Sequence, residues 1–260
     1  LLNVLKNLKN YKQTVLYYGP SSIKDIDNLL AKTFKTAKKF APLPKEKRYT
    51  LQTTPQNEVI IAPYNAKNIY MVQFHNENKE WNPNDAAKIS LFNEYFGGGM
   101  NAIVFQEMRE ARALAYTASA SYHMPNRLGD KDYFNTFIIT QNDKMMDCIA
   151  QFNELLNNMP VRLANFDLAK QNLLKSLAST RTTKFSILSA YMNAQKMGLN
   201  CTLSEKIYND LPSVTFDDII NFEKTNIGHK TFKYLILGDE KELDMKALEK
   251  IAPIKRVTTE

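Results

Sequence analysis

The sequence feature that most constrains the fold is a pair of alternating segments near the middle of the chain. In residues 116–123 and 133–140, apolar and polar side chains alternate, which is the period of a β-strand with one buried face. The segment between them contains Pro125, Asn126 and Gly129, residue types that favour turns. A long β-hairpin is therefore predicted, and another layer must cover its apolar side.

Strand and helix patterns flank this hairpin on both sides. Apolar residues recur every three or four positions in the helical segments and at every second position in the strands. Strands are predicted at residues 49–53, 58–62, 69–75 and 232–238, and helices at residues 82–96, 101–112, 142–158, 166–180, 184–198 and 244–251, with another beginning at the capping sequence of residues 215–218. This order indicates an α+β fold, a two-layer sandwich of a mostly antiparallel sheet with helices on one face.

The domain organisation is read from a proline-rich, charged segment at residues 41–48. It interrupts both helical and strand patterns, as a linker does. Before it, a strand at residues 14–18, a glycine and a helix resemble the strand at 232–238, its glycine and the helix that follows. We therefore predict that residues 1–40 are the helix–strand–helix tail of a preceding repeat domain, that 41–48 are a linker, and that 49–260 form a second copy.

Charge and hydropathy exclude several classes of protein. The net charge is +7, and residues 1–50 hold eleven Lys or Arg against three Asp or Glu. These lysines occur at helical intervals beside Leu, Ile and Phe, which favours the solvated face of a helix over a nucleic-acid or anionic-lipid site. No nucleic-acid partner is therefore predicted. No apolar run approaches eighteen residues, so no membrane span is predicted either.

The sequence offers no metal or nucleophile motif. His75, His123 and His229 are widely separated, and neither H-E-x-x-H nor H-x-x-E-H occurs. Two histidines share a helix face only at a spacing of three or four residues, so only a site assembled from distant residues stays open. There is no G-x-S-x-G elbow and no P-loop. The chain is predicted to bind no metal or other cofactor and to be inactive as an enzyme on its own.

The most informative motif covers residues 96–116, FGGGMNAIVFQEMREARALAY. Gly97, Gly98 and Gly99 alone favour a helix end and a turn. The longer stretch resembles the signature of the non-catalytic, C-terminal domain of insulinase/pitrilysin-type zinc metallopeptidases, the group that includes mitochondrial processing peptidase. The resemblance lies in the glycine-rich turn, in the Phe-x-x-x-Arg step that ends at Arg109, and in the Leu-x-Tyr that ends at Tyr116.

This resemblance implies specific roles for these residues. Arg109 and Tyr116 correspond to a substrate-binding pair that reaches across an internal cavity toward zinc held by the other half, and Gly97 to Gly99 to a loop that lines the cavity. A guanidinium and a phenol also suit a peptide carbonyl as hydrogen-bond donors. Without the resemblance, the sequence favours Arg109 as a solvated helix residue and Tyr116 as a sheet residue. Arg112 departs from the family register.

The resemblance also implies a function. The chain is expected to be the C-terminal substrate-binding part of a zinc-dependent metalloendopeptidase acting on extended peptides or unfolded polypeptides, with a processing-peptidase-like metallohydrolase fold. Its partner is an N-terminal half or subunit that carries H-x-x-E-H and the zinc. The alternative is a peptidase-inactive structural or docking subunit of the same fold. Bacterial relatives are often exported to the periplasm, which is the only indication of localisation.

Overall fold

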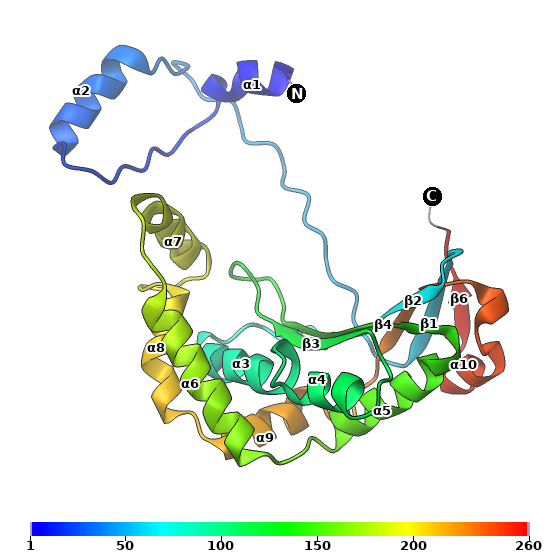
Figure 1. Ribbon diagram of the computed structural model, residues 1–260. Helices are drawn as coiled ribbons and strands as arrows, with labels where there is room; N and C mark the ends of the chain where they lie inside the picture. Colours follow the sequence, from blue (N-terminus) through cyan, green and yellow to red (C-terminus); the bar gives the residue numbers. More distant parts are fainter. Residues whose placement is uncertain (1, 259–260) are drawn as a thin grey trace. The chain divides into compact units, whose positions relative to one another are not determined.

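The computed structural model describes residues 2–258, and its internal contacts divide the chain into two compact units. The first comprises Leu1–Thr50 with Thr182–Met192, and the second comprises Leu51–Arg181 with Asn193–Glu260. The sheet and the helices that pack on it belong to the second unit (Figure 1). The assignment of residues 1–40 to a preceding repeat domain stays a prediction.

A six-stranded sheet forms one layer of the second unit. Its strands are β1 (Glu58–Pro63), β2 (Asn68–His75), β3 (Thr117–His123), β4 (Tyr133–Gln141), β5 (Lys233–Gly238) and β6 (Ile254–Arg256), in the order β3-β4-β2-β5-β1-β6. The neighbours β3 and β4, β4 and β2, and β2 and β5 pair in antiparallel fashion. Strand β1 is parallel to both β5 and β6. The predicted hairpin is confirmed as β3 and β4, with Thr117 opposite Ile139.

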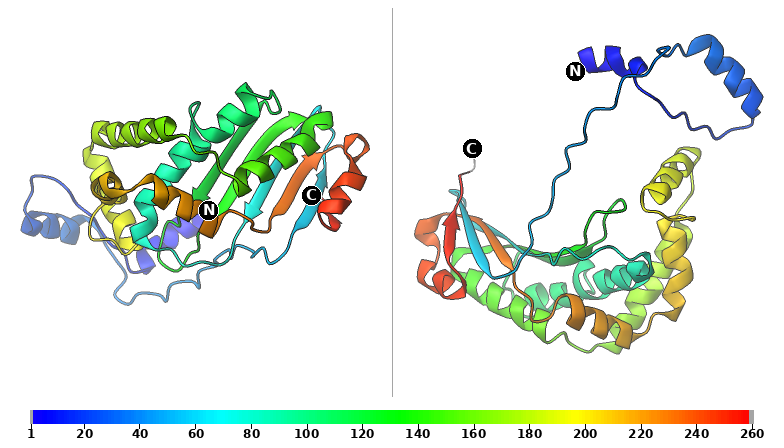
Figure 2. Two further views of the ribbon diagram at one scale, coloured as in Figure 1. Left: turned by 90° about the horizontal axis from the view of Figure 1, so that it is seen from below. Right: turned by 180° about the vertical axis from the view of Figure 1, so that it is seen from behind.

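Helices cover one face of this sheet, so the predicted two-layer α+β architecture is confirmed (Figures 1 and 2). The helices of the second unit are α3 (Ala86–Phe92), α4 (Ile103–Phe105), α5 (Met145–Asn157), α6 (Leu163–Ser179), α8 (Leu203–Asp210), α9 (Phe216–Asn226) and α10 (Met245–Ile251). Helix α7 (Lys184–Lys196) is divided between the two units. The chain continues α3 and α4 as π-helical segments at Asn93–Gly98 and Gln106–Glu110.

The core lies between the sheet and the helices. Strand β4 alternates buried and half-buried residues along its length, as the sequence pattern predicts. Phe92 of α3 stacks on Phe96 with ring centroids 5.1 Å apart, and it also contacts Phe134 of β4 and Phe222 of α9. These aromatic contacts join the sheet to two helices and fix the position of α3.

The first unit has little interior of its own. Besides its part of α7, it contains the helices α1 (Leu2–Asn7) and α2 (Ile23–Thr33), and none of residues 2–50 is buried. The strands expected at residues 14–18 and 49–53 are wrong for this chain, because both segments are irregular. For residues 14–18 the physical reason is that, within the described chain, no backbone hydrogen bond joins them to another segment.

Two elements were not expected from the sequence. Helix α8 begins where the Thr202 side chain accepts a hydrogen bond from the Glu205 backbone N–H. Strand β6 lies in a charged tail where Ile254 is half-buried and the two residues after it are exposed, so strand periodicity is absent. The capping box that opens α9, between Thr215 and Asp218, is confirmed.

Among residues 2–258, no helix has both the length and the apolar character needed to cross a bilayer.

Candidate functional site

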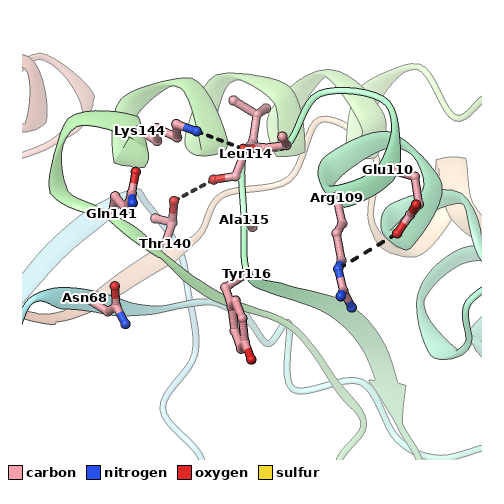
Figure 3. Close-up of a pocket in the computed structure, with 10 residues that line it drawn as sticks. Asn68, Arg109, Glu110, Leu114, Ala115, Tyr116, Thr140, Gln141 and Lys144 are labelled. Carbon is pink, nitrogen blue, oxygen red and sulfur yellow. Dashed lines mark hydrogen bonds and ion pairs between the residues drawn. The ribbon is translucent and has the colours of Figure 1, made fainter.

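Arg109 and Tyr116 come from different segments and line the same pocket. Arg109 lies in the π-helical segment after α4, and Tyr116 directly precedes β3. The pocket has a volume of about 430 Å³ and is lined by Asn68, Arg109, Glu110, Ala113, Leu114, Ala115, Tyr116, Thr140, Gln141 and Lys144. Figure 3 shows the Arg109 guanidinium and the Tyr116 ring directed to the same side of the pocket.

The Arg109 side chain is half exposed and partly held in place. Its guanidinium carbon lies 5.0 Å from the centroid of the Phe105 ring, within the range of a cation–π contact. Its Nε lies 3.8 Å from Glu110 Oε1, which is too long for a hydrogen bond. The guanidinium N–H groups are therefore oriented by the ring while they stay available to a ligand.

The neighbouring Arg112 has a structural partner instead. Its guanidinium and that of Arg162 both bind the carboxylate of Glu107, whose side chain is only 12% exposed. Because Arg162 immediately precedes α6, this network ties the π-helical segment to that helix. Arg112 is thus held by an ion pair with Glu107.

A tight turn places Tyr116 beside Arg109. Ala113 has φ +48°, in the left-handed region, and its carbonyl accepts a hydrogen bond from Lys144 Nζ at 3.0 Å. Thr140 Oγ1 donates to the carbonyl of Leu114 at 2.6 Å, and the Tyr116 backbone N–H donates to the Ile139 carbonyl at 2.8 Å. Both side-chain bonds are visible in Figure 3. The end of β4 and the start of α5 therefore fix the turn.

Replacing Ala113 with glycine should stabilise the protein by about 0.5–1 kcal/mol, because glycine adopts positive φ without the strain that a β-carbon causes. Ala111 is the matched control, since it is also exposed but has φ −78°. Glycine at position 111 should lower stability by a similar amount. Urea unfolding of the two variants measures both changes, and equal destabilisation by both would show that Ala113 is unstrained.

The three glycines do not line this pocket. Gly97 and Gly98 belong to the π-helical segment Asn93–Gly98, and Gly97 is buried where that segment crosses β3. A β-carbon on Gly97 would lie 1.9 Å from the Ala120 carbonyl oxygen, whereas nothing lies within 4 Å of one on Gly99. Close packing against β3 explains why residue 97 is a glycine. A cavity-lining role for the three glycines stays a prediction.

The histidines do not come together. His75 is buried, and its Nδ1 donates to the Thr231 carbonyl at 2.7 Å. His123 stacks on Tyr133, and His229 is exposed at the end of α9. Across residues 2–258, no three His, Cys, Asp or Glu side chains lie where they could hold a metal ion. The His, Cys, Asp and Glu side chains of these described residues are therefore not arranged as a zinc site.

A second polar cluster lies around Tyr122 and Asp132. Asp132 is 3% exposed, and its Oδ1 has no hydrogen-bond partner within the described residues. Burial raises its pKa to about 6, against the opposing effect of Lys79. The adjacent cavity measures about 10 Å³, room for at most one water, so the cluster is too closed to admit a ligand.

Sequence analysis missed the residues that support and complete the pocket. Asn68 and Gln141 pair across β2 and β4, and Thr140 is the last buried residue of β4. The alternating pattern identified the β4 strand, but the pairing of strand ends depends on register, which the pattern does not contain. The role of Lys144 could not be predicted from the sequence, because a lysine at the start of a helix is usually solvated.

Comparison with known proteins identifies a protein family and several structures that are similar to this chain. The sequence profile described as the peptidase M16 inactive domain matches residues 6–173, more than half of the chain. No curated protein sequence matches this chain. Similar solved structures include a peptidase M16 inactive domain from Pseudomonas fluorescens (18% identity, TM-score 0.61), a protease from Helicobacter pylori (12%, 0.63) and the periplasmic protease PqqL from Escherichia coli (16%, 0.63).

The aligned regions cover 84%, 84% and 85% of this chain but 51%, 53% and 25% of those three proteins, in the same order. This chain thus spans about half the length of the first two and a quarter of the third. At these identities the likeness shows the fold.

Proposed function

Because the chain belongs to the peptidase M16 inactive-domain family, we propose that it is the zinc-free, substrate-binding part of a zinc-dependent metalloendopeptidase. Its substrates are extended peptides or unfolded polypeptides. The observation that carries the proposal is that Arg109 and Tyr116, from separate segments, line one pocket. The described residues bring no set of donors together for zinc, and the sequence has no H-x-x-E-H, so in this proposal the metal and that motif belong to an N-terminal half or a partner subunit.

The pocket's chemistry supports binding of a peptide backbone. Arg109 offers fixed N–H donors, and Tyr116, whose side chain is 78% exposed, offers an O–H. Peptide carbonyl oxygens and C-terminal carboxylates are the acceptors that such donors bind. Lys144 and Thr140 act as positioning residues, because their hydrogen bonds hold the turn between Arg109 and Tyr116.

The alternative is a structural or docking subunit without a role in catalysis. The exposed apolar residues of the first unit favour it, because they indicate a surface for another protein. The two candidates differ in whether the loss of Arg109 changes hydrolysis. A docking role needs the surface of the chain but not this guanidinium.

The test is hydrolysis of a quenched fluorescent peptide library by the zinc-loaded H-x-x-E-H half, with and without this chain. We expect cleavage only when both are present. Arg109→Ala should reduce kcat/KM by about ten- to a hundredfold, the effect of losing one hydrogen bond from a charged donor. Tyr116→Phe should give a smaller reduction, because a neutral hydrogen bond contributes less.

Arg112→Ala is the matched control. It removes the same positive charge three residues after Arg109, at an arginine that already binds Glu107. We expect its kcat/KM to stay within about threefold of the parent, since Arg112 does not line the pocket and Glu107 keeps Arg162 as a partner. Equal activity of Arg109→Ala and the parent would contradict substrate binding by Arg109. Hydrolysis by this chain alone would contradict the assignment of zinc to a partner.

A further inference from the structure

We propose that the face of the sheet turned away from the helices holds two side-chain subsites for the same peptide that Arg109 and Tyr116 bind. Each subsite is a pair of apolar residues that face each other across β2 and β4, namely Tyr70 with Ile139 and Val72 with Phe137. The proposal deepens the proposed function and rests on it, because it takes a peptide to be bound at the pocket. It selects peptides with apolar side chains at alternate positions.

The first observation is the apolar character of this open face. Along β2, β4 and β5, buried residues alternate with half-buried or exposed ones, and Figure 2 shows the helices on one side of the sheet only. An antiparallel sheet with one solvated face normally carries polar side chains there. On these strands the open face instead includes Tyr70, Val72, Phe74, Phe137, Ile139 and Leu235. Contiguous apolar surface that is open to solvent marks a binding surface.

The second observation is that the pocket continues onto this face. Asn68 and Gln141, which line the pocket, pair with each other across β2 and β4. Because alternate residues of a strand lie on one face, this pair also lies on the open face. From the pocket along the two strands, the pairs on this face are Asn68–Gln141, Tyr70–Ile139 and Val72–Phe137. A polar pair in the pocket is thus followed by two apolar pairs.

The spacing of these pairs matches an extended peptide. Successive pairs on one face of a sheet are about 6.5–7 Å apart, which is the rise of two residues. Alternate side chains of an extended peptide have the same repeat, so a peptide that lies along β2 and β4 can place one on each apolar pair. Neighbouring side chains point to opposite sides, and only one of two neighbours can reach the sheet. The face therefore distinguishes alternating apolar residues from adjacent ones.

Peptide binding to the full chain, without the zinc-carrying half, tests this distinction. Two fluorescein-labelled peptides of about ten residues would span the pocket and both pairs when extended. They share one composition of leucine, serine and lysine, with the two leucines at alternate positions in the first and at adjacent positions in the second. By fluorescence anisotropy, we expect the alternating peptide to bind at least about tenfold more tightly, because both of its leucines are buried. Equal Kd values would overturn the proposal.

Two matched variants locate the subsites. Tyr70 is 38% exposed and Leu235 is 37% exposed on the same face, but Leu235 lies in β5, outside the line between β2 and β4. Threonine suits a strand at either position. Tyr70→Thr should reduce the preference for the alternating peptide to less than about threefold, whereas Leu235→Thr should keep it near tenfold. An equal loss of preference in both variants would overturn the assignment to this line.

Arg109→Ala tests whether the subsites are continuous with the pocket. This variant should weaken the binding of both peptides by a similar factor and leave their ratio unchanged, because Arg109 binds the backbone or a terminal group and not the leucines. Unchanged affinity of Arg109→Ala for both peptides would overturn the proposal, since the sheet face would then bind peptide independently of the pocket.

A second copy of this chain is the competing occupant of an apolar sheet face. Sedimentation velocity of the parent and of Tyr70→Thr at several protein concentrations distinguishes the two. We expect the sedimentation coefficient of the parent to be independent of concentration. Self-association of the parent that Tyr70→Thr removes would assign the face to a second copy and overturn the proposal.

Peptide hydrolysis together with the H-x-x-E-H half separates this inference from the proposed function. A chain that prefers the alternating peptide but supports no hydrolysis would leave the subsites standing and refute the proposed function. Hydrolysis that depends on Arg109, with equal Kd values for the two peptides, would do the opposite.

Discussion

Alanine at position 97 is expected to destabilise the second unit by about 3–5 kcal/mol, toward the upper end for a single substitution. The added β-carbon would lie 1.9 Å from the carbonyl oxygen of Ala120 and 2.9 Å from its Cα. These are backbone atoms in β3, which is fixed by its pairing with β4, so neither rotates away. The π-helical segment must instead move off the sheet, together with the buried Phe96 beside it.

Gly99→Ala is the matched control for this substitution. It adds the same methyl group two residues later, where no atom lies within 4 Å, and its φ of −127° suits alanine. Its stability should change by less than about 0.5 kcal/mol. Trp81, the sole tryptophan and mostly buried in the second unit, reports unfolding in urea by its fluorescence. A Gly97→Ala protein as stable as the parent would mean that the helix and β3 are not in close contact.

Gly97 also shows how far the sequence could predict this fold. The glycine triplet indicated a helix end, and the helix does end at Gly98. The sequence could not show that Gly97 is required by a strand more than twenty residues later, because that contact depends on how the layers pack. The same distinction holds for β3 and β4, whose alternation predicted the hairpin, and for β6, whose short charged sequence has no period and is placed by β1.

The candidate site was predictable to a similar degree. The Phe-x-x-x-Arg and Leu-x-Tyr steps identified Arg109 and Tyr116, and the structure adds that both line one pocket. Lys144 and Thr140 contribute through single hydrogen bonds to backbone carbonyls, and such bonds leave no periodic trace in a sequence. Whether the pocket binds peptide stays a prediction.

Glu223 was also hidden from sequence analysis, since a glutamate in a helix is normally solvated. In α9 it is 2% exposed, and its Oε1 has no partner in the described part of the chain. Burial raises its pKa from 4.5 to about 7, with Lys224 opposing the shift. The folded protein therefore binds this proton more tightly than the unfolded chain, so ionisation of Glu223 lowers stability.

Glu223→Gln should consequently stabilise the protein most at high pH. Each pKa unit corresponds to about 1.4 kcal/mol, so the ionised carboxylate costs up to roughly 3 kcal/mol above pH 7. This cost disappears as the pH falls through 7 toward 4.5, because the carboxyl becomes neutral in the folded state. The variant should thus be more stable than the parent by up to roughly 3 kcal/mol at pH 8, and by less than about 1 kcal/mol at pH 5.

The comparison must be made as a difference between variant and parent, because other buried groups titrate in the same range. Asp132, whose pKa is raised to about 6, also favours the folded state as pH falls. His75 acts in the opposite direction, since burial lowers its pKa and the unfolded chain takes up its proton below about pH 6.5. Both contributions cancel in the difference. Urea unfolding at pH 8 and pH 5 gives it, with Glu249→Gln, an exposed site in α10, as the control. A stabilisation by Glu223→Gln that is equal at both pH values would show that Glu223 does not ionise in this range in the folded protein.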